Sequence, residues 1–339
     1  MKETSHYEID TACIPAHEFP AALIDLACSR GLHSDKLLRG TGIFMEDVLT
    51  GELTLRPAQC FALLGNLRKL LPAADSAFLA GARLYPGNFG PAASALQSSA
   101  NLLAAIQVIV KYQAILSPLL SPRLEWHCDA LFIHWHDACG AGEHIAFLAD
   151  MMISALVATT KHLAGRTLPW QFYLPGEPDH REQYQVHWGP HLHTGSHQYS
   201  MQIARKELEQ TWPGAATSVN QIASRQCERR LQQGSAEGFI TAFDKYLRNH
   251  LPCNPSLETA ANEFAISPAT LKRKLKKHHT SFQLRFDLVR KEQALFWLTH
   301  EQLPLAEIAA RLHFHDTRNL RRAFKRWTGM IPSQLLAAH

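Results

Sequence analysis

The chain has few cysteines, and they do not form the pattern of a disulfide-stapled or zinc-binding protein. Its seven cysteines are scattered over 339 residues, are odd in number and form no Cys-x-x-Cys pair. We therefore expect neither a disulfide framework nor a structural zinc site, and we predict a reducing compartment, the cytoplasm.

Motifs of catalysis and of membrane insertion are also missing. The sequence has no Gly-rich phosphate loop, no His-Glu-x-x-His and no Gly-x-Ser-x-Gly, so we expect no enzyme, no catalytic residue and no cofactor. The segment Met1 to Pro15 is polar and acidic rather than basic and then apolar, which does not indicate a secretory signal. The most apolar run, Ile145 to Thr160, is interrupted by Asp150 and is short for a bilayer, so no membrane association is predicted.

Charge divides the chain into two parts. Residues 240–339 contain 16 Lys and Arg against 8 Asp and Glu, a formal charge of +8. The remaining 239 residues contain 18 basic and 22 acidic side chains, a formal charge of −4. A basic C-terminal module joined to a mildly acidic one points to phosphate contact by the former.

Hydrophobic periodicity predicts four segments. Residues 1–15 are expected to be a flexible N-terminus, and residues 16–212 an α+β (mixed α/β) domain in which long helices flank a strand hairpin near 124–136. Residues 213–237 are expected to be a linker, in part helical. Residues 238–339 are expected to form an all-α domain.

Two helix-turn-helix patterns follow one another in the last hundred residues, at 256–275 and 305–324. In each, a short amphipathic helix is followed by a break, a polar N-cap candidate (Ser267 or Asp316) and a basic helix. A long helix over 282–298 joins the two units. This arrangement is typical of proteins that place a basic helix in the major groove of DNA, here twice.

The recognition helices have a predicted inner and outer face. Leu271, Leu275, Leu320 and Phe324 should point inward. The outward residues, which we expect to contact DNA, are Ala269, Thr270, Lys272, Arg273, Lys276, Thr317, Arg318, Arg321, Arg322 and Lys325. Arginine can donate two hydrogen bonds to guanine, whereas lysine more often neutralises phosphate.

Residues 238–339 resemble the DNA-binding module of the AraC/XylS family of transcription regulators. The resemblance is carried by the tail from Phe314 to Pro332 and by Arg290 and Ala294 on the joining helix. It implies base contacts from Ala269, Lys272 and Arg273 in the first unit and from Thr317, Arg318, Arg321 and Arg322 in the second. Three positions depart from the family pattern: Ala265 and His313 replace the usual turn glycines, and Leu320 replaces a Phe.

Residues 16–212 are similar to the N-terminal domain, called arabinose-binding-like, of a subgroup of these regulators. The stretches Leu26 to Leu32, Tyr85 to Gly90 and Tyr112 to Pro118 carry this similarity. It implies an activator that senses a small-molecule effector, forms a homodimer, binds double-stranded promoter DNA and contacts RNA polymerase.

The effector site is less well marked. Aromatic residues that could line a ligand pocket are Phe132, Trp135, Trp170, Tyr173 and Trp188. The alternative is a metal- or redox-responsive regulator that uses Cys128 or the His-rich loop 187–197, which contains His187, His191, His193 and His197. No carboxylate or cysteine stands in ligand register with these histidines, so no metal ligand is assigned.

Overall fold

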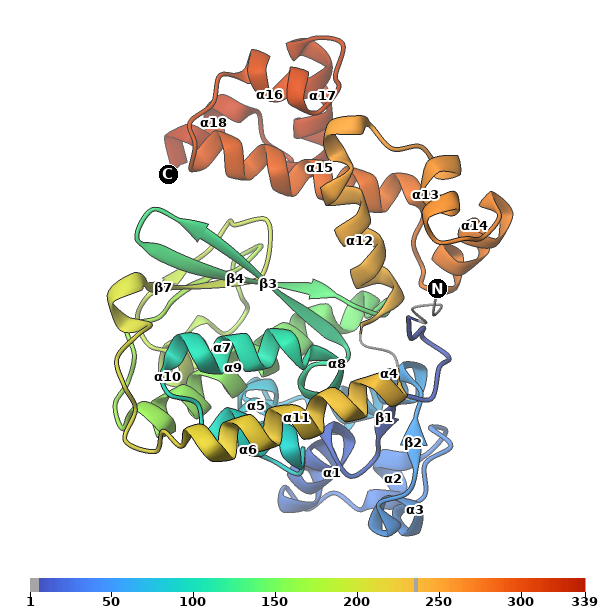
Figure 1. Cartoon of the computed structure of the whole chain (residues 1–339), viewed down its shortest axis with the longest axis vertical. Helices are drawn as coiled ribbons and strands as arrows, with labels where there is room; N and C mark the ends of the chain where they lie inside the picture. Colours follow the sequence, from blue (N-terminus) through green and yellow to red (C-terminus); the bar gives the residue numbers. More distant parts are fainter. Residues whose placement is uncertain (1–5, 235–236, 339) are drawn as a thin grey trace. The chain divides into compact units, whose positions relative to one another are not determined.

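The computed structural model describes residues 6–234 and 237–338, in which the chain forms two compact units, Met1–Phe239 and Ile240–His339 (Figure 1). The first unit contains both helices and strands, and the second is helical. The expected fold class, a mixed α/β domain followed by a helical domain with two helix-turn-helix units, is confirmed.

The first unit is built around a five-stranded sheet with the order β3-β4-β7-β5-β6. All neighbours are antiparallel except β5 and β6. The strands are β3 (Leu120–His127), β4 (Ala130–Asp137), β5 (Gln171–Tyr173), β6 (Leu192–His193) and β7 (Ser200–Ala204). The predicted hairpin is β3–β4, and its turn lies at Cys128 and Asp129, where Cys128 adopts a left-handed backbone (φ 47°).

Helices cover one face of this sheet and extend beyond it. They are α1 (Phe19–Ser29), α2 (Ser34–Leu38), α3 (Met45–Thr50), α4 (Pro57–Leu70), α5 (Ser76–Leu84), α6 (Pro91–Gln97), α7 (Leu102–Lys111), α8 (Gln113–Leu116), α9 (Ile145–Ala164), α10 (Arg181–Trp188) and α11 (Thr217–Gln233). A two-stranded sheet of β1 (Ile14–Pro15) and β2 (Thr54–Leu55) lies beside them.

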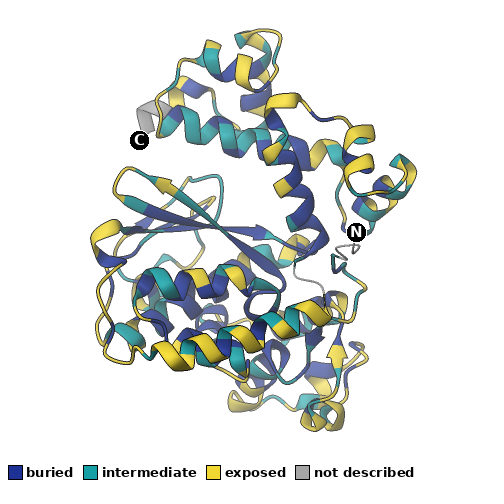
Figure 2. Cartoon of the chain, viewed as in Figure 1, coloured by how far each residue is buried: buried dark blue, intermediate teal, exposed yellow. Residues whose placement is uncertain are grey.

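Helix α9 is the central helix of this unit. By length and composition it could cross a membrane, yet much of its surface is buried in the protein core (Figure 2). It packs closely against α5, where a Cβ on Gly81 would lie 2.1 Å from the carbonyl oxygen of Met151. Gly81 lies within α5, and its lack of a side chain permits this close contact between two helices.

Both ends of the first unit are packed against its core. Residues 1–5 lie outside the described residues, but Tyr7 is buried and its hydroxyl donates to the carbonyl oxygen of Pro118 at 2.8 Å. Residues 6–15 are thus packed rather than flexible, because Tyr7 and β1 contribute to the core. Most of the expected linker is the helix α11, whose buried Ala223 and Cys227 face the body of the unit.

The second unit consists of short helices around one long helix. They are α12 (Phe239–Asn249), α13 (Leu257–Glu263), α14 (Pro268–Lys277), α15 (Phe282–Thr299), α16 (Leu305–Arg311), α17 (Thr317–Thr328) and α18 (Pro332–Ala338). Arg285 of α15 forms a buried, two-pronged ion pair with Asp244 of α12. Because two parallel hydrogen bonds fix both position and angle, this pair anchors the long helix to α12.

Candidate nucleic-acid interface and effector cavities

The first helix-turn-helix unit is α13 and α14. The Ser267 hydroxyl caps α14 by accepting a hydrogen bond from the backbone N–H of Thr270 at 3.1 Å. Leu271 and Leu275 are fully buried, as their spacing predicts. The opposite face of α14 exposes Ala269, Lys272, Arg273 and Lys276, while Thr270 is half-buried and hydrogen-bonded to Ser267.

The second unit, α16 and α17, repeats this construction. The Asp316 carboxylate accepts from the backbone N–H of Asn319 at 2.7 Å, and this hydrogen bond lowers the pKa of Asp316. Leu320 and Phe324 are buried. The outer face of α17 exposes Arg318, Arg321, Arg322 and Lys325, with Thr317 half-buried at its first turn.

Ion pairing distinguishes the arginines on these outer faces from their neighbours. In the described part of the chain, no carboxylate lies within salt-bridge distance of Arg273, Arg321 or Arg322. Two neighbouring arginines do form ion pairs: Arg326 pairs with Asp287 at 3.1 Å, and Arg311 pairs with Glu307 at 2.5 Å. An unpaired arginine at the surface retains all its donors for phosphates and base edges.

The turns contain two non-glycine residues in the left-handed region. Ala265 has φ 53° and His313 has φ 57°, so both adopt the conformation that the family usually gives to glycine. Nε2 of His313 donates to the carbonyl oxygen of Pro252 at 2.7 Å. The imidazole thus connects the second turn to the segment preceding α13, a contact that glycine cannot make.

Arg290 of α15 connects the two units as well. Its guanidinium lies over the Phe286 ring at 4.0 Å and over the Phe314 ring at 5.2 Å, and it donates to Oδ1 of Asn254 at 2.8 Å. Asn254 precedes α13, and Phe314 belongs to the turn before α17. One side chain therefore fixes both units to the helix between them.

The five aromatic residues expected at an effector site do not come together. Trp135, Trp170 and Trp188 belong to the hydrophobic core of the first unit, where the Trp188 indole donates to Oγ of Ser154 at 2.8 Å. Phe132 and Tyr173 stand apart from that core, with ring centroids 5.9 Å apart. The structure thus divides this set between the core and the other face of the sheet.

The His-rich loop does not assemble a metal site. Among the described residues, no group of three or more His, Cys, Asp or Glu side chains is placed to hold a metal ion. His187 is on α10 and stacks on Phe78 at 4.7 Å, and His193 stacks on Tyr173 at 4.8 Å. The metal-responsive alternative is therefore not favoured.

Cys128 does not support a redox site either. It is exposed at the β3–β4 turn, with its Sγ 3.4 Å from Nε2 of His127. Cys128 lies in the turn and not in β3, and the turn brings these two side chains together. One exposed cysteine beside one histidine is not by itself a redox site, so the redox-responsive alternative is likewise not favoured.

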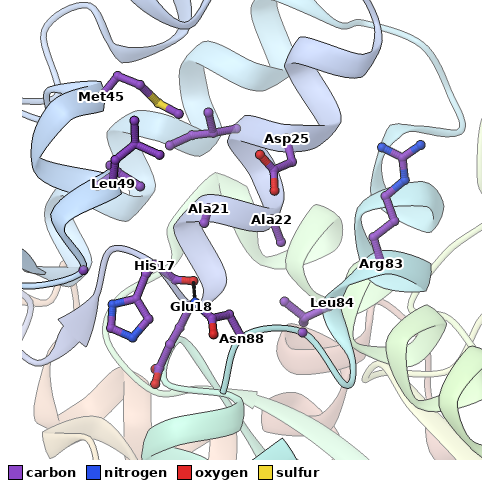
Figure 3. A pocket seen from close by; sticks show the side chains of 14 residues that line it. His17, Glu18, Ala21, Ala22, Asp25, Met45, Leu49, Arg83, Leu84 and Asn88 are labelled. Carbon is purple, nitrogen blue, oxygen red and sulfur yellow. Dashed lines mark hydrogen bonds between the residues drawn. The ribbon is translucent and has the colours of Figure 1, made fainter. Parts of the chain in front are cut away.

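A cavity of about 660 Å³ lies between α1, α3 and the end of α5 (Figure 3). Its polar lining consists of His17, Glu18, Asp25, Arg83 and Asn88. Glu18 is buried and accepts from Nη1 of Arg230 at 2.5 Å, so its charge is already balanced by α11. The volume lies within the ~300–1,000 Å³ of small-molecule sites.

A second cavity of about 320 Å³ lies beside α9 and contains a buried acid. Asp150 is 8 % exposed, and burial raises its pKa to about 7. Its Oδ2 accepts from the Tyr184 hydroxyl at 2.7 Å, while no described residue hydrogen-bonds to its buried Oδ1. The sequence signal for this site was a single carboxylate inside an apolar helix.

Comparison with known proteins agrees with both halves of the structure. The model described as the arabinose-binding domain of AraC transcription regulator, N-term, matches residues 31–211, and that of a helix-turn-helix domain matches residues 260–338. The ornithine utilization regulator of Pseudomonas aeruginosa is 32% identical over 257 residues, 75% of this chain and 76% of that protein. The HTH-type transcriptional regulator VqsM of the same organism is 33% identical over 80 residues, which are 24% of this chain and 25% of VqsM.

Among solved structures, the chain is similar to the transcriptional regulator CdpR from Pseudomonas aeruginosa. The alignment covers 94% of this chain and 98% of the CdpR chain, with a TM-score of 0.41 and 20% sequence identity. The family model of the N-terminal domain spans more than half of the chain, and the helix-turn-helix module follows it in the order that the fold shows. The chain belongs to the AraC family of transcription regulators, with an N-terminal ligand-binding domain and a C-terminal helix-turn-helix DNA-binding domain.

Proposed function

We propose that the chain is a transcription activator that binds two successive major-groove segments of promoter DNA with α14 and α17. The observation that carries this proposal is the pair of capped helices with exposed, unpaired basic side chains, fixed to one rigid helix. A fixed separation suits recognition of two groove segments one helical turn apart, roughly 34 Å.

Roles within the interface follow from side-chain chemistry. Arg273 on α14, and Arg318, Arg321 and Arg322 on α17, would read base edges. Lys272, Lys276 and Lys325 would contact phosphates and supply affinity independent of sequence. The short side chains of Ala269, Thr270 and Thr317 lie at the first turns, where a recognition helix approaches the bases most closely.

The first unit would control this activity. We infer that it binds a small organic effector, works as a homodimer in the cytoplasm without membrane association, and allows contact with RNA polymerase when the effector is bound. The relative named as an ornithine utilization regulator supports an effector from nitrogen metabolism. Helix α11 supports the dimer because it exposes two large apolar side chains, Val219 and Ile222.

Selection of binding sites from random duplexes by the full chain tests the DNA-binding proposal. We expect two blocks of preferred bases about 10 base pairs apart. Arg273→Ala should erase preference in one block, and Arg322→Ala in the other. A single block, or loss of the same block in both variants, would contradict the proposed use of both helices.

A further inference from the structure

The buried carboxylate of Asp150 is a polar group in the first unit that the DNA-binding function leaves unexplained. It lies within α9 and interrupts an apolar run, since its neighbours Ala149, Met151 and Met152 are buried and apolar. A buried carboxylate normally accepts several hydrogen bonds, since each unsatisfied oxygen costs desolvation free energy. Here Tyr184 satisfies one oxygen, the other is buried without a partner among the described residues, and Asp150 is one of the residues that line the cavity.

The remaining lining of this cavity has the character of a cation site. Two further carboxylates, Glu177 and Asp179, stand among the exposed residues at its edge, and the described lining contains neither Lys nor Arg. The rings of Phe78, Tyr184 and Tyr199 form part of the wall. Aromatic faces attract ammonium groups, and carboxylates pair with them, so both kinds of lining favour the same ligand charge.

The positively charged side chains nearby do not pair with Asp150. Arg181 is engaged with Glu177 at 2.6 Å and with the carbonyl oxygen of Leu192 at 3.1 Å. His180, the one lining residue that could become positive, is exposed and lies 3.5 Å from Glu182. In the larger cavity, by contrast, the buried Glu18 already has its arginine. Of the two cavities, only the smaller has a buried carboxylate that lacks a cation.

We infer that the cavity beside α9 is the effector site and that it binds a small aliphatic amine through its ammonium group, with Asp150 as the counter-ion. Oδ1 of Asp150 accepts from the ammonium, Oδ2 keeps its bond from Tyr184, and the rings surround the adjoining methylenes. A second amino group on the same ligand would reach Asp179 at the edge. This inference rests on the proposed function, because it names the ligand class of the sensor domain.

Calorimetric titration of the full chain at pH 8 tests the assignment with four probes of similar size: 1,4-diaminobutane, butylamine, 1-butanol and butyrate. We expect saturable binding of the diamine, weaker binding of the monoamine, and none of the alcohol or the anion. Asp150→Asn should weaken diamine binding at least about tenfold, while its amide still accepts from Tyr184 and preserves the fold. Asp25→Asn makes the same chemical change in the larger cavity and should leave diamine binding unchanged.

The outcomes separate this inference from the proposed function. Equal binding of butanol and diamine, or undiminished diamine binding by the Asp150→Asn chain, would overturn the ammonium site. Binding that is lost in Asp25→Asn instead would assign the effector to the larger cavity and also overturn it. A mobility-shift assay without amine tests DNA binding alone, so a chain that binds DNA but no diamine refutes only the ligand assignment.

Discussion

Replacement of Asp150 by Asn should change how the stability of the chain depends on pH. In the folded protein, burial raises the pKa of Asp150 to about 7, whereas an unfolded aspartate titrates near 3.8. A carboxyl group with a raised folded pKa stabilises the fold most when protonated, below the unfolded value. That contribution is lost as the pH rises through the window from about 4 to about 7.

The size of the effect follows from the two pKa values. At ~1.4 kcal/mol for each pH unit, the rise from 3.8 to about 7 corresponds to roughly 4 kcal/mol of folding free energy lost by neutral pH. Asparagine does not ionise and retains an oxygen for the Tyr184 hydroxyl. The free energy of unfolding of the variant should therefore rise relative to that of the wild type by roughly 2 kcal/mol between pH 5 and pH 7, and the difference should level off above about pH 8.

Urea unfolding of both chains over pH 5–8.5, followed by tryptophan fluorescence, measures this difference. The other titrating groups are common to both chains and cancel in the comparison. Asp25→Asn, the same chemical change at an exposed position, provides the control for the substitution itself. A pH-independent difference for Asp150→Asn would refute the view that this carboxylate is buried and ionises at a cost.

Three further predictions concern other parts of the chain. Arg322→Ala should cost ~1–3 kcal/mol at the base it reads, whereas Lys276→Ala should weaken binding to all sequences alike and reduce the salt dependence of DNA affinity, as filter binding at several salt concentrations would show. Ala265→Gly should stabilise the chain by roughly 0.5–1 kcal/mol in thermal unfolding, because glycine relieves the left-handed backbone, while His313→Gly should gain nothing because it loses the hydrogen bond to the preceding segment. Ile222→Glu on the exposed face of α11 should shift the chain toward monomer in sedimentation velocity, and an unchanged dimer would rule out that face.

The DNA-binding module could be predicted closely because its signals are local. The N-cap Ser267 and the spacing of Leu271 and Leu275 set the start and the inner face of α14 within a dozen residues. The contacts that the sequence did not reveal join residues far apart along the chain. The hydrogen bond from His313 to Pro252 joins positions 61 residues apart, and from the sequence alone His313 was simply a departure from glycine.

The sensor domain was harder to predict because its structure depends on pairing between strands that are far apart in the sequence. The β3–β4 hairpin was found from one short turn, but the order that places β7 between β4 and β5 depends on contacts across some 30 to 70 positions. The expected pocket failed to assemble for the same reason. Aromatic residues mark a core as readily as a ligand site, and the sequence alone does not show which face of the sheet each one joins.

Gly81 and Asp150 are two residues that a buried pair of helices would not be expected to contain, and the same close packing explains both. Glycine weakens a helix and a carboxylate is costly in a core, so each alone counts against a buried helix pair. Together they make sense. Gly81 allows α5 to approach the turn of α9 that contains Met151, and the neighbouring Asp150 is thereby enclosed with Phe78, one turn before Gly81, in the wall of its cavity. Since close packing at this point both buries the acid and builds the aromatic wall around it, the costs borne by these two residues are best understood as the requirements of a binding site.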